Sequence, residues 1–342
     1  MENPNEVLSA AEEHQLISSD ESIPLNGFRK YQGVWLAEFF LPGVINAQRD
    51  FKARPTDILL ATYPKCGTTW LKALAFSIAT RARLSFTGHP LHDLSPHACI
   101  PLLEEECLNF DGISKLDVMN NEEPRLLQTH MPFSLLPESI KTSNCRLVSI
   151  YRDPKDALIS FWYFRNKIWG SCGGTYTVVP FAVFFEMFYQ GIIGFGSIWE
   201  HALGYWNESL RAPGRILFLK YEELLEAPVE NLTKLAEFMG CPFTVEEVKR
   251  GVPEEISSLC NFNKLSDAAA KQDRATGVAG TIGLKPEAYF RKGVAGDWKN
   301  HLSSEMAQKL DQMTEEKLQG TGLVIRHPDH EATKIYGRMH GR

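Results

Sequence analysis

Four short apolar runs alternate along this chain with segments of helical periodicity. Such runs are typical of strands buried on both faces, and strands that alternate with helices form a parallel sheet. The sequence therefore predicts an α/β fold with a central parallel sheet flanked by helices on both faces. The runs lie in DILLATYP from Asp57, RLLQTH from Arg125, CRLVSIYRDP from Cys145 and RILFLKYEELLEAP from Arg215.

Polar groups follow these runs at their carboxyl ends, where open parallel sheets bind their ligands. We therefore expect four strands to present phosphate- or proton-handling groups at one edge of the sheet. The groups are residues 62–65, His130, Arg152 and Tyr221.

The first run continues through the loop YPKCGTTW into a predicted helix, TTWLKALAFSIAT. The N–H groups of residues 66–69 would lie at the N-terminus of that helix, where the dipole and unpaired amides attract a phosphate. A Walker A loop places its lysine directly after a glycine, whereas Lys65 precedes Gly67 here. This order weakens the case for a Mg²⁺-bound triphosphate. The expected buried face of the helix holds Leu71, Leu74, Ala75 and Ile78.

The third run leads into a second predicted helix, DPKDALISFWYF. Asp153 can cap it, Pro154 suits its first position and Asp156 favours its first turn. Arg152 stands where this helix begins, and the guanidinium fork suits a phosphate. Ser160, two turns along the helix, is within reach of the same anion.

Later segments differ in their patterns. VENLTKLAEFMG reads as a helix that stops at Gly240. From Asn263 to Gly296 the periodicity is weak and glycines are frequent, so we expect a long mobile loop there. VVPFAVFFEMFYQGIIGFGSIW, from Val178, is long enough to span a bilayer but contains Glu186, so a buried helix or an aromatic pocket wall is favoured.

Charge and cysteine usage exclude some classes of protein. The net charge of −6 argues against general affinity for nucleic acid or anionic membranes. The seven cysteines are scattered without a C-x-x-C pair, which predicts reduced thiols and neither a disulfide framework nor a zinc site. The N-terminus lacks the pattern of a signal peptide, so we expect a cytoplasmic protein.

Three segments, in the order of a known family, resemble motifs of the plant-type cytosolic sulfotransferases. TYPKCGTTW resembles their 5′-phosphosulfate-binding loop, YRDPKDALIS their 3′-phosphate-binding segment, and RKGVAGDWKNH their C-terminal motif. The similarity extends from about Arg29 to Leu323. It implies a P-loop-like three-layer fold and transfer of a sulfonyl group from 3′-phosphoadenosine 5′-phosphosulfate (PAPS), without a metal, to a hydroxyl of a small acceptor.

The resemblance also implies roles for individual residues. Lys65 would stabilise the leaving phosphate oxygen, and His130 would be the general base that takes the proton of the acceptor, a task that suits the pKa of histidine. The other histidines receive no role. The remaining donor-binding residues would be Cys66, Gly67, Thr68 and Thr69 at the 5′-phosphate, Trp70 and Phe262 around adenine, Tyr221 at the purine, and Arg152, Ser160, Arg291, Lys292 and Gly293 at the 3′-phosphate.

Two positions depart from the pattern of the family. Many relatives carry a lysine two places before the histidine, where this chain has Gln128, which can donate a hydrogen bond but carries no charge. A dimerisation motif near the C-terminus is not reproduced after Lys299, so we expect a monomer or a weak homodimer.

The predicted organisation is a polar, disordered segment 1–30, a single domain 31–323 and a disordered tail 324–342. The partners expected are a small acceptor, with flavonoid, steroid, phenolic and hydroxyjasmonate-like alcohols left open, and neither nucleic acid nor membrane. Two alternatives also stay open: a small-molecule kinase with an altered phosphate loop, and an inactive relative that only binds a nucleotide or small molecule.

Overall fold

The computed structural model describes residues 27–108, 112, 116, 124–171, 179–276 and 285–325. At its centre lies a four-stranded sheet in the order β4-β3-β5-β6, and every neighbouring pair is parallel. The strands coincide with the four apolar runs, which confirms the predicted sheet. They are β3 (Ile58–Thr62), β4 (Leu126–Thr129), β5 (Arg146–Tyr151) and β6 (Ile216–Lys220).

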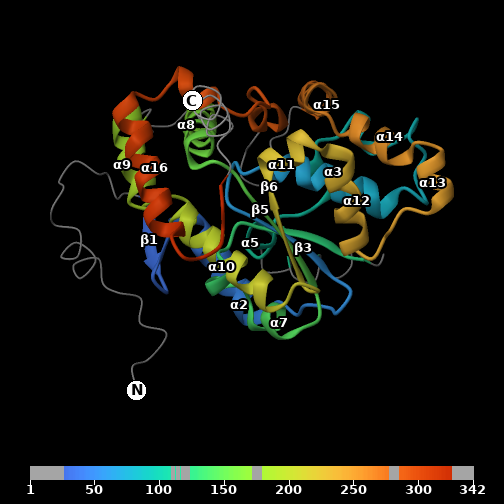
Figure 1. Ribbon diagram of the computed structural model, residues 1–342, viewed down its shortest axis with the longest axis horizontal. Helices are drawn as coiled ribbons and strands as arrows, with labels where there is room; N and C mark the ends of the chain where they lie inside the picture. Colours follow the sequence, from blue (N-terminus) through green and yellow to red (C-terminus); the bar gives the residue numbers. More distant parts are fainter. Residues whose placement is uncertain are drawn as a thin grey trace, which may run out of the picture.

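Alternate residues of the strands point to opposite faces, and helices cover both (Figure 1). Ile58 and Leu60 pack with α3 (Thr68–Thr80), α12 (Pro228–Phe238) and α14 (Val252–Leu259). Leu59 and Ala61 pack on the other face with α2 (Leu41–Asp50) and α10 (Ile198–Arg211). The predicted three-layer α/β fold is therefore confirmed.

The first two predicted helices begin as their local signals indicate. Gly67 adopts φ 100° directly before α3, whose predicted apolar face is buried. α8 (Pro154–Ser171) starts with proline, and the Asp153 carboxylate accepts a hydrogen bond from the N–H of Lys155 at 2.8 Å. After α12 the chain turns at Gly240, which has φ 75°.

The prediction of a continuous loop over 263–296 is wrong in its first half. Residues Phe262–Thr276 form α15, in which Leu265, Ala268 and Ala269 are buried at the spacing of one helical face. The Asn261 side chain accepts the N–H of Lys264 at 2.9 Å and caps the helix. Because alanine contributes little apolar contrast, this face is weak in the sequence although alanine favours helix strongly. Residues 277–284 lie outside the described part of the chain.

The apolar segment from Val178 is divided rather than continuous. It contains α9 (Phe181–Tyr189), then a turn with positive φ at Gly191, Gly194 and Gly196, and then the start of α10. Phe184, Phe185 and Phe188 are buried, which confirms a buried helix. Among the described residues, no helix has the length and apolar character needed to cross a membrane.

The ends of the chain differ slightly from the predicted boundaries. The antiparallel pair β1 (Phe28–Tyr31) and β2 (Val34–Ala37) begins inside the predicted polar segment 1–30. Residues 1–26 and 326–342 lie outside the described part.

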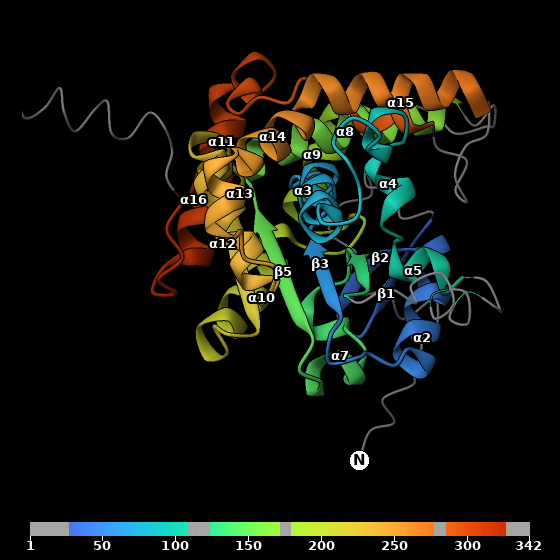
Figure 2. The same cartoon turned by 90° about the vertical axis from the view of Figure 1, so that its right-hand side faces the viewer.

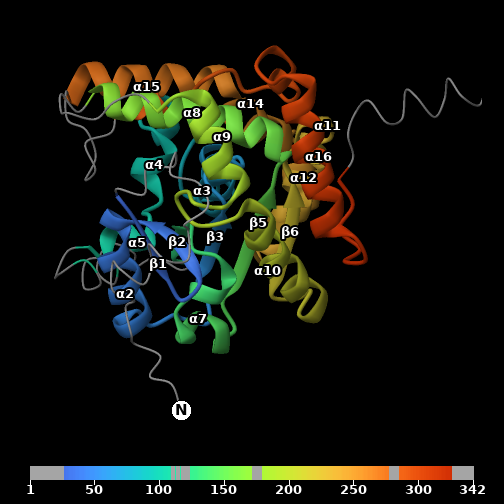
Figure 3. The same ribbon diagram turned by 90° about the vertical axis from the view of Figure 1, so that its left-hand side faces the viewer.

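Helices at the carboxyl ends of the strands shape the region above the sheet. In Figures 2 and 3, α8 and α15 both run above these ends, and Figure 1 shows them apart, on opposite sides of that region. The remaining elements are η1 (Glu38–Phe40), η2 (Pro90–His92), α4 (Pro96–Cys99), α5 (Leu103–Glu106), η3 (Phe133–Leu135), α7 (Glu138–Thr142), α11 (Tyr221–Glu226), α13 (Val245–Lys249), η4 (Pro286–Tyr289), η5 (Asp297–Asn300) and α16 (Ser304–Leu318).

Candidate active site

A cavity of about 340 Å³ lies at the carboxyl ends of the strands. It gathers Pro64, Lys65, His130, Arg152 and Tyr221, which follow four different strands, whereas Thr62 and Tyr63 are buried outside it. Among the described residues, no group of three or more histidine, cysteine or acidic side chains is arranged to hold a metal ion. The predicted site residues that line the cavity are Lys65, Gly67, Thr68, Thr69, Trp70, His130, Arg152, Ser160, Tyr221, Phe262, Arg291, Lys292 and Gly293.

Cys66 is the predicted site residue that does not reach the cavity. Its side chain is fully buried, and its N–H donates to the carbonyl of Tyr63 at 3.2 Å. Burial raises the pKa of the thiol to about 12. The Cys66 side chain therefore packs in the hydrophobic core rather than facing the cavity.

The loop after β3 holds an unusual backbone conformation. Lys65 has φ 68°, which is costly for a residue with a side chain and is characteristic of functional sites. A Cβ atom at Gly67 would lie 2.8 Å from the Tyr221 ring, so only glycine fits between this ring and α3. The loop thus places the N-terminus of α3 at the cavity.

The Lys65 side chain lies among aromatic rings and other cations. Its Nζ is 4.0 Å from the centre of the Phe164 ring and donates to the carbonyl of Tyr289 at 3.4 Å. Burial lowers its pKa to about 7, and the positive charges of Arg152, Arg291 and Lys167 act in the same direction. An anion bound between these cations would raise the pKa of Lys65 again.

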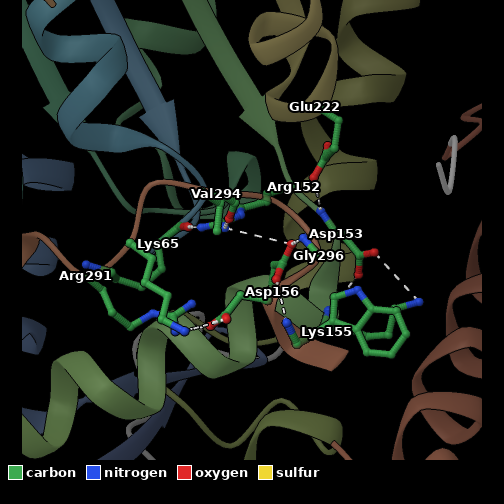
Figure 4. A network of polar contacts seen from close by, with 12 residues as sticks. Lys65, Arg152, Asp153, Lys155, Asp156, Glu222, Arg291, Val294 and Gly296 are labelled. Atoms are coloured by element: carbon green, nitrogen blue, oxygen red, sulfur yellow. Dashed lines mark hydrogen bonds and ion pairs between the residues drawn. The ribbon is translucent and has the colours of Figure 1, made fainter. Parts of the chain in front are cut away.

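Arg152 connects the two sides of the cavity (Figure 4). Its guanidinium donates to the carbonyl of Lys65 at 3.2 Å and to that of Val294 at 3.0 Å. It also lies 4.5 Å from the centre of the Tyr221 ring. The side chain is therefore held at the start of α8, where the helix dipole favours an anion.

Asp156 fastens the segment that follows Arg291 to α8. One carboxylate oxygen accepts the N–H of Gly296 at 2.6 Å, and the other accepts the N–H of Trp298 at 3.1 Å. Figure 4 shows Asp156 between Arg152 and Gly296. We call these two hydrogen bonds the Asp156 clasp. In the sequence Asp156 is recognisable only as a helix-start residue, because its hydrogen-bond partners Gly296 and Trp298 are some 140 positions away.

Asp297 holds the two cations of this segment in place and offsets one of their positive charges. It pairs with Arg291, with Lys292 at 2.7 Å and, through a hydrogen bond of 3.0 Å, with Asn300. Burial acts to raise the pKa of Asp297, but the hydrogen bonds from Lys292, Arg291 and Asn300 outweigh it and leave the pKa well below its usual value. The acid remains ionised and orders the segment.

Aromatic side chains form the other end of the cavity. The Trp70 ring meets Tyr221 edge-on with centroids 5.8 Å apart, and Phe262 meets Phe290 in the same way at 5.6 Å. Gly293 has φ 68°, and a Cβ there would lie 2.3 Å from the Phe262 ring. The predicted pair Trp70 and Phe262 thus lines one cavity with flat apolar surfaces.

His130 is held in one tautomer at the end of β4. Its Nδ1 lies 2.7 Å from the carbonyl oxygen of Thr62, so Nδ1 carries the hydrogen and Nε2 keeps a lone pair. The backbone N–H of His130 donates to the carboxylate of Glu104 at 2.7 Å. Burial lowers the pKa of the imidazole to about 3, against the opposing effect of the Thr62 carbonyl, and Lys72 and Lys65 lower it further. The ring is therefore neutral at physiological pH.

Gln128 lies behind His130 rather than in the cavity. It is 1% exposed, and its Nε2 is 3.3 Å from His130 Nδ1. Because both of these nitrogens are donors when Nδ1 bonds to Thr62, Gln128 packs behind the ring without a hydrogen bond to it.

The structure adds His97 to the cavity, although sequence analysis gave this residue no role. It comes from the short helix α4, stacks on Tyr289 with centroids 3.7 Å apart, and lies 2.9 Å from the Thr69 hydroxyl. No motif around it signals this position, because the sequence does not show that α4 packs on α3. Phe164 of α8 and Tyr289 of η4 also line the cavity, with ring centroids 5.3 Å apart.

The sequence relatives of this chain are sulfotransferases. Residues 55–322 match the sequence model of the sulfotransferase domain. The chain is 43% identical to flavonol 4′-sulfotransferase of Flaveria chlorifolia, over 87% of this chain and 90% of that protein. It is 40% identical to cytosolic sulfotransferase 17 of Arabidopsis thaliana, over 88% and 85%.

Solved structures show the same fold. A sulphotransferase of Arabidopsis thaliana superposes with a TM-score of 0.68 and 32% identity, over 93% of this chain and 98% of that chain. Mouse sulfotransferase SULT7A1, in a complex with PAP, superposes with a TM-score of 0.65 and 25% identity, over 92% and 100%.

Proposed function

This chain belongs to the sulfotransferase family, and on that premise we propose how its residues transfer a sulfonyl group from PAPS to a hydroxyl group of a small molecule. The enzyme is a PAPS-dependent sulfotransferase. Its structural neighbour SULT7A1 was solved with PAP, the product that PAPS leaves after transfer.

The cavity suits the adenosine bisphosphate part of the donor. The N-terminus of α3, with Gly67, Thr68 and Thr69, would bind the 5′-phosphate. Trp70, Phe262 and Tyr221 would bind the adenine. The 3′-phosphate would be bound by Arg152, Ser160, Arg291, Lys292 and Gly293.

The observation that carries the mechanism is the placement of His130 and Lys65 in one cavity, with the Nδ1 hydrogen of His130 directed to Thr62. Nε2 is then free to accept the proton of the acceptor hydroxyl as its oxygen attacks sulfur. The bond between sulfur and the phosphate oxygen breaks on the opposite side. Lys65 offsets the negative charge that develops on that oxygen.

The acceptor is a small molecule whose identity the cavity leaves open. Phe164 and Tyr289 supply aromatic walls near Lys65, in keeping with a planar or polycyclic alcohol. Flavonoid, steroid, phenolic and hydroxyjasmonate-like alcohols all belong to this class. Our proposal also includes a single catalytic domain over residues 31–323, a cytoplasmic location, a monomer or weak homodimer, and no nucleic-acid or membrane partner.

The function is tested by offering ³⁵S-labelled PAPS with a panel of flavonols, phenols and sterols, in the absence of Mg²⁺. We expect label in an acceptor with the wild-type chain. Transfer of ³²P from γ-labelled ATP in the presence of Mg²⁺, with no ³⁵S transfer from PAPS, would favour the kinase alternative. Tight PAP binding without any transfer would favour the inactive relative.

His130→Ala tests the base. We expect transfer to fall by about a hundredfold or more while PAP affinity changes little, because Nε2 acts on the acceptor and not on the donor. His92→Ala is the matched control, since the His92 Nε2 pairs with the Phe86 carbonyl outside the cavity. Near-normal turnover of His130→Ala would overturn the assignment.

A further inference from the structure

Two adjacent threonines at the start of α3 have different partners. The Thr68 hydroxyl lies 2.7 Å from the Thr62 hydroxyl in the protein interior. The Thr69 hydroxyl lies in the cavity wall, 2.9 Å from the Nε2 atom of His97. Of the two cavity-lining threonines, only Thr69 has its hydroxyl oriented by a histidine.

Lys72 sets the direction of the hydrogen bonds at His97. Its Nζ donates to the carbonyl of Ile100 at 2.9 Å and lies 3.3 Å from the Nδ1 atom of His97. In its ammonium form Lys72 can only donate, so Nδ1 of His97 accepts and Nε2 carries the imidazole hydrogen. Nε2 then donates to the Thr69 oxygen, and the hydrogen of that hydroxyl is left for another acceptor.

The surroundings keep this arrangement in place. Lys72 is 1% exposed, and His97 is held between α3 and the Tyr289 ring. Burial, together with the positive charges of Lys72 and Lys65, holds the pKa of His97 well below its usual value, so the ring stays neutral with one hydrogen. A neutral ring between two fixed partners has one consistent tautomer.

We propose that Lys72, His97 and Thr69 form a hydrogen-bond relay, in which His97 is a positioning residue that turns the Thr69 hydroxyl hydrogen toward the phosphosulfate oxygens of the donor. This inference rests on the proposed function, because it takes the anion beside Thr69 to be that of PAPS. It differs from a purely structural role, in which His97 would act only by stacking on Tyr289.

A double-mutant cycle separates the two roles. His97→Phe keeps a ring against Tyr289 but removes both nitrogens, and Thr69→Val removes the hydroxyl but keeps the branched shape. We expect kcat/KM for PAPS to fall about fivefold in His97→Phe and about tenfold in Thr69→Val, the range of a single hydrogen bond to a charged group. The double variant should lie within about twofold of Thr69→Val, because His97 acts through that hydroxyl. Losses that multiply to about fiftyfold would overturn the relay.

A second pair of variants carries the test if His97→Phe folds poorly. The amide nitrogen of His97→Gln can reach the place of Nε2, whereas that of the shorter His97→Asn reaches only the place of Nδ1. We expect His97→Gln to retain kcat/KM for PAPS within about twofold and His97→Asn to lose about fivefold. Equal losses in the two variants would contradict the relay.

The controls distinguish this inference from the proposed function. His92→Phe makes the same substitution outside the cavity and should leave kcat/KM for PAPS unchanged. A wild-type chain that transfers no sulfonyl group from PAPS would sink the proposed function and the relay with it. A wild-type chain that is active, with additive effects at His97 and Thr69, would sink the relay alone.

Discussion

The loop Lys65–Trp70 and the segment Arg291–Trp298 line the same cavity but are held in place by different means. The loop is positioned chiefly by its own neighbours in the sequence, β3 before it and α3 after it, and distant residues add the Arg152 bond to the Lys65 carbonyl. The segment is positioned from a distance, by the Asp156 clasp and by the Arg152 bond to Val294. The loop half of the donor site can therefore form from residues close together in the sequence. The segment half forms only when distant parts of the domain have assembled.

We also expect the two regions to affect different kinetic quantities, the loop through Lys65 the rate of transfer and the segment the affinity for the donor. The loop brings Lys65 to the bond that breaks, and the segment brings cations to the far end of the donor. Replacing Lys65 in the loop should lower kcat, and loosening the segment should raise the dissociation constant of PAP. Three predictions test this division.

The largest effect is expected for Lys65→Met. We expect kcat to fall by about a hundredfold or more, because the developing charge on the phosphate oxygen loses its counter-charge. PAP binding, measured by calorimetry, should weaken far less. A variant that loses PAP affinity as strongly as kcat would show that the loop serves binding as much as chemistry.

An intermediate effect is expected for Asp156→Ala. The N–H groups of Gly296 and Trp298 would lose a charged acceptor, and KM for PAPS should rise about thirtyfold with kcat nearly unchanged. Asp267→Ala, which removes an exposed aspartate of α15, is the control and should have no effect. A drop in kcat at saturating PAPS would contradict the division between the two regions.

The smallest effect is expected from pH. The free protein holds the pKa of Lys65 at about 7, so the lysine is charged below that pH and increasingly neutral above it. The charged form binds the anionic donor better, and KM for PAPS should therefore rise by about threefold between pH 7 and pH 9 and then level off. Lys72 also has a pKa of about 7 because of its burial, so the same profile is measured on Lys65→Met. A rise that persists unchanged in Lys65→Met would assign the pH dependence elsewhere.

Most of the framework follows from short-range patterns. Strands β3 to β6, the start of α3 at Gly67 and the start of α8 at Pro154 were predictable, because each depends on residues within a few positions of one another. The same holds for the phosphate-binding character of the loop. The family motifs added Arg291 and Lys292, which composition alone would not have connected with Arg152.

The tertiary structure decided what depends on contacts between distant residues. The segment of α15 forms a helix despite its weak apolar pattern, because Leu265 and its alanine neighbours are buried against the domain. The His130 tautomer depends on a carbonyl of β3, and the place of His97 depends on the packing of α4 on α3. The sequence by itself determined which residues could bind a phosphate or move a proton. Only the fold decided which of them meet, because hydrogen bonds and burial act over a few ångströms in space regardless of separation along the chain.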